Sequence, residues 1–275
     1  MFLRLLAIET RKTLKHPALW IGLGGLVFLL SLVTLIEHAQ IANGYQPANG
    51  YQPANGGLER DLLTGLSYFS WIGILVYAVT ASVISAFDYP DRSIQLWLTR
   101  GVTRSMLLLS RLIVTLFFGL MLVCFAVFSI LVIASLSRLV FFGNVDASNL
   151  NLSAFPSAIL RVFWSALPYL ALTVLFAVIS RSPLFAAGGT IIYGTVIENL
   201  LANLENRFPT LVRYLPSQLA QVLQINNLTL DRTALPLPLD AAVMPEARAI
   251  LAIGIIFIIL SAVALAIFSR QDLGG

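Results

Sequence analysis

The chain has 275 residues, of which 58% are hydrophobic and only 11% are charged, and its net charge is +4. A soluble domain carries about 25% charged residues, so this composition excludes a globular protein with a water-facing surface and indicates a chain that lies mostly in lipid. The single cysteine, Cys124, excludes a disulfide framework and a thiolate metal site. Because Cys124 lies within an apolar run, we predict that its side chain is small, buried and inert.

Residues 1–17 have the pattern of an amphipathic helix that lies in the membrane interface. At about 100° per residue, the apolar side chains fall on one arc and the basic side chains on the opposite arc. Pro17 ends this helix before the first span. The alternative is a basic segment that flanks the first span and does nothing more. The residues predicted to contact the interface are Phe2, Leu6, Arg11, Lys12 and Lys15.

Six apolar runs are long enough to cross a bilayer, which takes about 20 helical residues. They predict spans at residues 18–36, 66–87, 105–133, 158–179, 184–201 and 247–268. The third run is long and would need a tilt or an extension beyond the membrane. We therefore predict an all-α membrane protein in which residues 18–275 form one domain of six transmembrane helices.

Lysine and arginine placement predicts the orientation of these spans. With the N-terminus inside, the inner segments hold ten basic and four acidic residues, a net charge of +6. The outer segments then hold seven basic and nine acidic residues, a net charge of −2. Because basic residues are enriched in cytoplasmic loops, we predict a multi-pass protein of the cytoplasmic membrane with both termini cytoplasmic.

A tandem repeat, "NGYQPANGYQPANGG" at residues 43–57, follows the first predicted span. Its period of six is far below the 20–50 residues of a solenoid unit, and its Asn-Gly and Pro residues favour turns. We interpret it as a spacer on the outer side; a binding loop is the alternative.

The loop between the second and third predicted spans contains "DYPDRSIQLWLTRGVTR". Ile94, Trp97 and Leu98 follow at helical spacing and form one apolar face of a short helix that ends at Gly101. Tryptophan and arginine are enriched in binding hot spots, so this helix is a candidate docking surface. A helix that rests on the membrane, with Trp97 as its anchor, is the alternative.

The chain resembles the membrane subunit of ABC-2-type ABC exporters in its layout. The resemblance rests on Glu9-x-x-Lys12 followed by "HPALW", and on the inner loop with "GVTR" at residues 101–104. Arg111 stands where that family often has lysine, and the acidic residues before Ser93 depart from the family pattern. In that family an interfacial helix precedes six spans, and the inner loop between spans two and three is the coupling helix.

The resemblance implies partners that this chain needs for transport. It implies a separate ABC ATPase subunit that carries ATP and Mg²⁺, and a second permease copy, as a homodimer or a related heterodimer. It also implies that residues 202–246 shape an outer gate. The residues that it assigns to ATPase coupling are Asp91, Arg92, Ile94, Trp97, Leu98, Arg100 and Arg104.

The chain itself carries no motif for ATP hydrolysis or metal binding. The phosphate loop G-x-x-x-x-G-K-[ST] is absent, so we expect no enzymatic activity and no cofactor in this chain. His16 and His38 lie near opposite ends of the first span, so a shared metal site is not expected, and no Ser-His-Asp arrangement is legible. We expect lipid as a partner and no nucleic acid.

Two ionisable residues within the spans are candidates for function. Glu198 is the only acidic residue embedded in a span, and we expect its carboxylate to reach water at the interface; a residue that faces a translocation path or pairs with an arginine is the alternative. Arg111 is expected to extend back to the inner surface. An ATP-driven exporter subunit is the main hypothesis. A secondary transporter, a membrane enzyme and a membrane assembly protein are the rivals, and the substrate stays open.

Overall fold

The computed structural model describes residues 2–43, 57–86, 89, 101–145, 153, 155–205, 207–227 and 244–271. Within these ranges the regular secondary structure is helical, without strands. The helices are α1 (Phe2–Lys15), α2 (Pro17–Ala42), α3 (Leu58–Ala86), α5 (Arg104–Phe142), α6 (Phe155–Ser180), α7 (Pro183–Ile192), the π-helical turn η3 (Tyr193–Ile197), α8 (Glu198–Ala202), α9 (Pro209–Arg213), α10 (Pro216–Asn227) and α11 (Glu246–Arg270).

Five helical segments of the described residues are long and apolar enough to cross a membrane. They are α2, α5, α6, the continuous segment Pro183–Ala202 and α11. Helix α3 adds a sixth if its arms Thr64–Ser70 and Ile72–Ala86, which are bent by 47°, count as one span. The prediction of an all-helical membrane protein is therefore confirmed, with five or six candidate spans.

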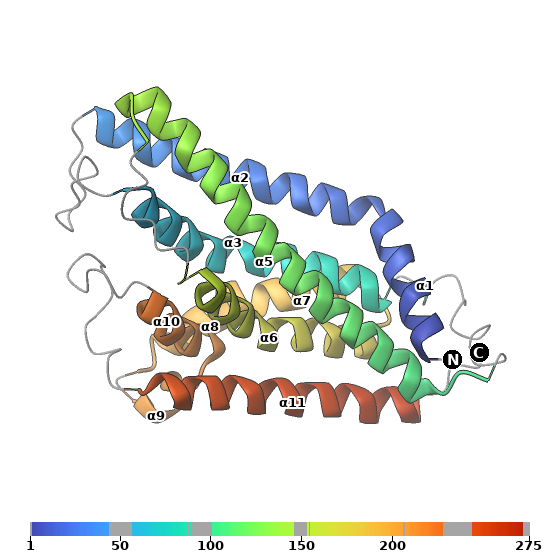
Figure 1. Cartoon of the computed structure of the whole chain (residues 1–275). Helices are drawn as coiled ribbons and strands as arrows, with labels where there is room; N and C mark the ends of the chain where they lie inside the picture. The colour runs from blue at the N-terminus through green and yellow to red at the C-terminus, as the bar shows by residue number, and fades with distance from the viewer. Residues whose placement is uncertain are drawn as a thin grey trace.

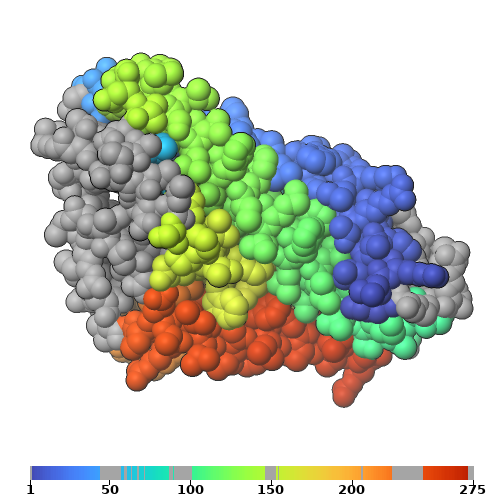
Figure 2. Space-filling model, in the orientation of Figure 1, coloured from blue at the N-terminus to red at the C-terminus, as the bar shows by residue number. Residues whose placement is uncertain are grey.

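The long helices run between two ends of the molecule (Figure 1). Helix α1, the beginning of α5 and the end of α11 lie together at one end, which we call the α1 end. Helix α10, the end of α2 and the beginning of α3 lie at the other, which we call the α10 end. On the face in Figure 2, α5 runs between α1 and α2 on one side and α11 on the other. Helix α5 therefore reaches from one end to the other.

Local sequence signals account for where the helices begin and end. Pro17 occupies the first turn of α2, and His16 Nδ1 accepts a hydrogen bond from the amide of Ala18 at 3.2 Å. Thr103 Oγ1 accepts from the amide of Met106 and caps α5 at its beginning. Gly143 ends α5 with a φ of 72°, a left-handed conformation that glycine adopts without a steric penalty.

Packing divides each outer helix into a protein-facing and a lipid-facing stripe. Leu19, Leu23, Leu26 and Leu30 of α2 are buried at intervals of three or four residues. They join a hydrophobic core with α3, α5 and α6. Helix α6 is the central helix, because nearly all its side chains from residue 162 to residue 178 are buried. Membrane helices of this kind are held together by close packing, since lipid is as apolar as the core.

The buried environment predicted for Cys124 is wrong. Its side chain is exposed on α5, on the same face as the exposed Phe117 and Phe128. Phe117 precedes Cys124 by seven residues and Phe128 follows it by four, and both spacings place side chains on the same side of a helix. The apolar run around Cys124 could not separate a lipid-facing position from a buried one, because both are apolar.

Gly65 of α3 lies in tight contact with α5. A Cβ atom at this position would lie 2.5 Å from Ile130 Cγ2, whereas nothing lies within 4 Å of a Cβ at Gly24. We expect Gly65→Val to lower the free energy of unfolding by about 1–3 kcal/mol through overpacking. Gly24→Val, on the exposed side of α2, is the matched control. Unfolding of both variants in bicelles would check this, and equal stability would contradict the tight contact.

Candidate functional site

The described residues enclose a cavity near the α10 end, between α3, α6, η3 and α10. It is partly open. We call it the α10 cavity. Its lining residues are Phe69, Ser70, Ile74, Tyr77, Val162, Ser165, Ala166, Tyr169, Gly194, Ser217, Ala220, Gln221 and Gln224. Aromatic rings, hydroxyls and amides therefore share its wall, and no lining residue is charged.

Glu198 lies directly behind this wall. Its side chain is only 1% exposed, so the prediction that this carboxylate reaches water is wrong. The hydroxyl of Tyr169 and the amide of Ser217 both donate to Glu198 Oε2, each at 2.9 Å. The other oxygen, Oε1, has no hydrogen-bond partner among the described residues. Glu198 thus accepts hydrogen bonds from two residues of the cavity wall through one oxygen, and its other oxygen accepts none from the described residues.

Three local features place Glu198 there. The π-helical turn η3 immediately precedes it, and such turns interrupt α-helices most often at functional sites. At Gly194 a Cβ atom would lie 3.1 Å from Tyr169 Cε1, so a larger residue would require the Tyr169 ring to shift by a few tenths of an ångström. Ser217 is the second residue of α10, and its amide is one of the free donors at a helix N-terminus, where a carboxylate is stabilised.

A buried ion pair joins α1 to α5 at the α1 end. Arg111 Nε lies 3.9 Å from Glu9 Oε1, and Arg111 Nη1 donates to the carbonyl oxygen of Ser85 at 2.8 Å. Arg111 is only 1% exposed, so the prediction that it extends to the surface is wrong. Helix α1 covers this part of α5 and brings Glu9 to it. Sequence reasoning had used Glu9 only as part of a family pattern.

Helix α1 presents a mixed surface to its surroundings. Leu5, Glu9 and Thr13 face the protein at intervals of four residues. Phe2 and Leu6 are half-buried, while Leu3 is 77% exposed. Of the other residues predicted to contact the membrane interface, Arg11 and Lys15 are exposed and Lys12 is half-buried. An exposed surface with both apolar and basic groups is compatible with a membrane interface, which stays a prediction.

Most of the predicted coupling residues lie outside the described residues: Asp91, Arg92, Ile94, Trp97, Leu98 and Arg100. The tandem repeat, apart from Asn43 and Gly57, also lies outside them. Arg104 is described and begins α5. Its Nη1 donates to the carbonyl oxygens of Ser269 and Gln271 at 3.1 and 2.6 Å, so its charge stabilises the C-terminus of α11. Its part in coupling stays a prediction.

Two titratable groups outside the spans at the α1 end have shifted pKa values. Burial, and secondly the charge of Lys12, lower the pKa of His16, which favours the neutral imidazole that accepts from Ala18. Burial raises the pKa of Tyr89, against the opposing effect of Arg111 and Arg181. Both groups are therefore uncharged at neutral pH.

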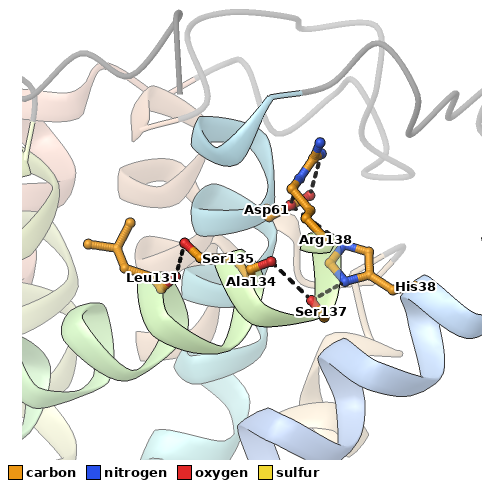
Figure 3. Close-up of polar contacts among 7 residues, drawn as sticks. All are labelled: His38, Asp61, Leu131, Ala134, Ser135, Ser137 and Arg138. Carbon is orange, nitrogen blue, oxygen red and sulfur yellow. Dashed lines mark hydrogen bonds and ion pairs between the residues drawn. The ribbon is translucent and has the colours of Figure 1, made fainter. Parts of the chain in front are cut away.

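A buried polar cluster ties three helices together at the α10 end (Figure 3). Arg138 of α5 donates to both carboxylate oxygens of Asp61 on α3, with Nη2 3.2 Å from Oδ1. His38 of α2 lies with Nε2 3.5 Å from Asp61 Oδ2 and with Nδ1 2.5 Å from Ser137 Oγ. All four side chains are buried. We call these residues the Asp61 cluster.

The Asp61 cluster brings a serine, a histidine and an aspartate together, an arrangement that was not legible in the sequence. Sequence spacing had no signal for it, because His38 and Ser137 are 99 positions apart. The arrangement nevertheless lacks what a nucleophilic serine needs. Ser137 is 1% exposed and donates to the carbonyl oxygen of Ala134 at 3.1 Å, and Arg138 holds the carboxylate. The cluster is therefore a structural tie between helices.

Among the described residues, no group of three or more His, Cys, Asp and Glu side chains could hold a metal ion.

Comparisons with known proteins identify the chain by its sequence. No curated protein matches the chain. A family model described as "ABC-2 family transporter protein" matches residues 5–197, from α1 through η3.

Proposed function

Because the chain belongs to the ABC-2 transporter family, we propose that it is the membrane-spanning subunit of an ATP-driven exporter. The family match over residues 5–197 is the observation that carries this proposal. Membership supports a multi-pass permease that associates with an ABC ATPase. We further propose that transport is outward, that two copies of the chain associate, and that the inner-loop residues couple to the ATPase. ATP and Mg²⁺ would bind to the partner subunit, and this chain would hold neither.

We propose that the α1 end faces the cytoplasm. The described basic residues near this end include Arg4, Arg11, Lys12 and Lys15 of α1. Positive residues favour the cytoplasmic side of a membrane. The end of α3 at Ala86 and the beginning of α5 at Arg104 also lie there, so the loop that joins them would meet an ATPase in the cytoplasm.

Helix α5 would carry motion from that loop across the membrane. At the α1 end, the Glu9–Arg111 pair joins it to α1, and Arg104 joins it to the C-terminus of α11. At the α10 end, the Asp61–Arg138 pair joins it to α3. A pull on the beginning of α5 would therefore displace several helices as one body, which is how packed helices switch between discrete states.

The pathway would form between two copies of this chain, as in the resembled exporters. The lipid-facing stripe of α5, with Phe117 and Phe128, is one apolar surface open to a second copy or to lipid. Symmetric pairing of one surface with itself is the commonest way in which identical subunits associate.

Coupling is tested by replacing Trp97 with alanine in a chain co-expressed with an ABC ATPase. If Trp97 is a hot spot worth about 2 kcal/mol, we expect ATPase association to weaken about 30-fold and transport in proteoliposomes to fall with it. Asp91→Ala should act in the same direction. Phe28→Ala, at an exposed position of α2, is the matched loss of an aromatic side chain and should leave both readouts unchanged.

The same assay separates the rival functions. Trp97→Ala and Asp91→Ala variants that associate and export like the unmodified chain would make the coupling assignment wrong. Transport that follows an ion gradient without ATP would instead favour a secondary transporter.

A further inference from the structure

We propose that the α10 cavity binds the organic ammonium group of a cationic amphiphile, with Glu198 as its counter-charge. The proposal rests on the transporter function for its biological meaning, because it names the class of cargo. Its physical basis is separate, and consists of a buried carboxylate without a cation and of the wall of the cavity.

Glu198 differs from the other buried acidic residues that the structure describes. Glu9 pairs with Arg111 and Asp61 pairs with Arg138, whereas Glu198 forms hydrogen bonds and no ion pair within the described ranges. An unpaired charge in a membrane-spanning segment costs several kcal/mol, and residues of this kind mark binding sites and ion paths. Glu198 therefore lacks a cation that its two counterparts possess.

The hydrogen bonds of Glu198 favour its charged form and leave room for a further partner. Tyr169 and Ser217 both donate to Oε2 at 2.9 Å, and the N-terminus of α10 adds a favourable dipole. Oε1 accepts no hydrogen bond from a described residue. Burial opposes the charge of this carboxylate, so a cation beside the unused Oε1 would supply the stabilisation that the two donors leave incomplete.

The wall of the α10 cavity suits an ammonium group better than an anion. Phe69 and Tyr77 meet edge to face with centroids 5.7 Å apart, and Tyr169 adds a third ring. Aromatic faces attract cations, above all desolvated quaternary ammonium groups. The hydroxyl of Tyr77 is buried and has no partner among the described residues, so it can accept a ligand contact. The lining holds no lysine or arginine that an anion would need.

Tyr169 connects the two parts of the site. Its ring lines the cavity and its hydroxyl donates to Glu198, so a cation against this ring lies next to the carboxylate. The cavity is partly open. A longer chain would extend through the open side.

The experiment measures ligand binding by the full-length chain in nanodiscs of zwitterionic lipid. The probes are benzyltrimethylammonium and its uncharged carbon isostere, neopentylbenzene, and the readout is the shift of the thermal unfolding midpoint with concentration. We expect the cation to bind the unmodified chain at least tenfold more tightly than the isostere. We expect Glu198→Gln, which can still accept from Tyr169 and Ser217, to lose this preference and keep its affinity for the isostere.

Two further variants control this test. Glu246→Gln removes a carboxylate at the same end, where Glu246 pairs with Arg161, and should leave cation binding unchanged. Tyr169→Phe keeps the ring and removes the hydrogen bond to Glu198, so it should weaken cation binding several-fold. Comparing variants with the same probe cancels its partitioning into lipid. Tyr169→Phe also tests the proposal if Glu198→Gln does not fold.

Equal binding of the two probes to the unmodified chain would overturn the proposal, and so would full cation preference in Glu198→Gln. The assay contains neither ATP nor an ATPase, so its failure says nothing against the transporter function. Conversely, a chain that binds the cation but shows no ATP-driven transport would support this binding site and contradict the proposed transporter function.

Discussion

Replacing Asp61 with alanine should lower the free energy of unfolding by about 3–5 kcal/mol, one of the largest single effects expected in this protein. The change leaves the charge of Arg138 buried without the carboxylate that it contacts through two nitrogens. It also removes the group that His38 Nε2 faces at 3.5 Å. Because Asp61 joins α3 to both α2 and α5, all three helices lose a contact at the α10 end.

The double variant Asp61→Leu/Arg138→Met separates the pair from the rest of the packing. Replacing both members of a buried ion pair with apolar residues is often neutral, so we expect the double variant to be more stable than Asp61→Ala. Reversible unfolding in mixed micelles is the measurement. A loss of less than about 0.5 kcal/mol in Asp61→Ala, as at an unimportant surface position, would contradict a buried pair here.

Replacing Arg111 with methionine should release α1 from α5 and cost about 3 kcal/mol. Glu9 would stay buried without its guanidinium, and the carbonyl oxygen of Ser85 would lose a donor at 2.8 Å. This loss of stability lies at the lower end of the range for a broken buried ion pair, because Glu9 Oε1 and Arg111 Nε are 3.9 Å apart and attract each other less than a closer pair. Protease cleavage within α1, followed together with unfolding, is the measurement.

Lys15→Met is the control for this second prediction, because Lys15 lies on the same helix and is exposed. It should leave cleavage and stability unchanged. If α1 is also part of the moving body that we propose, Arg111→Met should reduce transport more than its stability loss explains. Unchanged protection of α1 in Arg111→Met would show that apolar contacts of Leu5, and not the ion pair, hold the helix.

Composition and periodicity were sufficient for the class of protein. Apolar runs of about 20 residues leave few structures other than membrane helices, because backbone groups in lipid must bond within their own segment. For this reason the all-helical class and the presence of several spans could be predicted correctly, whereas the family was predicted from the resemblance of short motifs. The number of spans was less certain, since α3 bends by 47° in a run that reads as continuous.

The embedded acid at residue 198 was also visible in the sequence, because a charge within an apolar run stands out. Its partners were not visible. Ser217 reaches Glu198 across 19 positions and Tyr169 across 29, through contacts that only the packing of α6, α8 and α10 creates. The empty space beside them has no sequence signal, since it depends on side chains of four separate elements.

The sequence by itself therefore determined that this chain lies in lipid, that it is helical and which family it belongs to. The tertiary structure decided which charges are paired. Arg111 was expected at the surface and is buried against Glu9, and Cys124 was expected in the core and is exposed. The physical reason is that lipid and protein interior are equally apolar, so hydrophobicity cannot show which side of a membrane helix faces its neighbours.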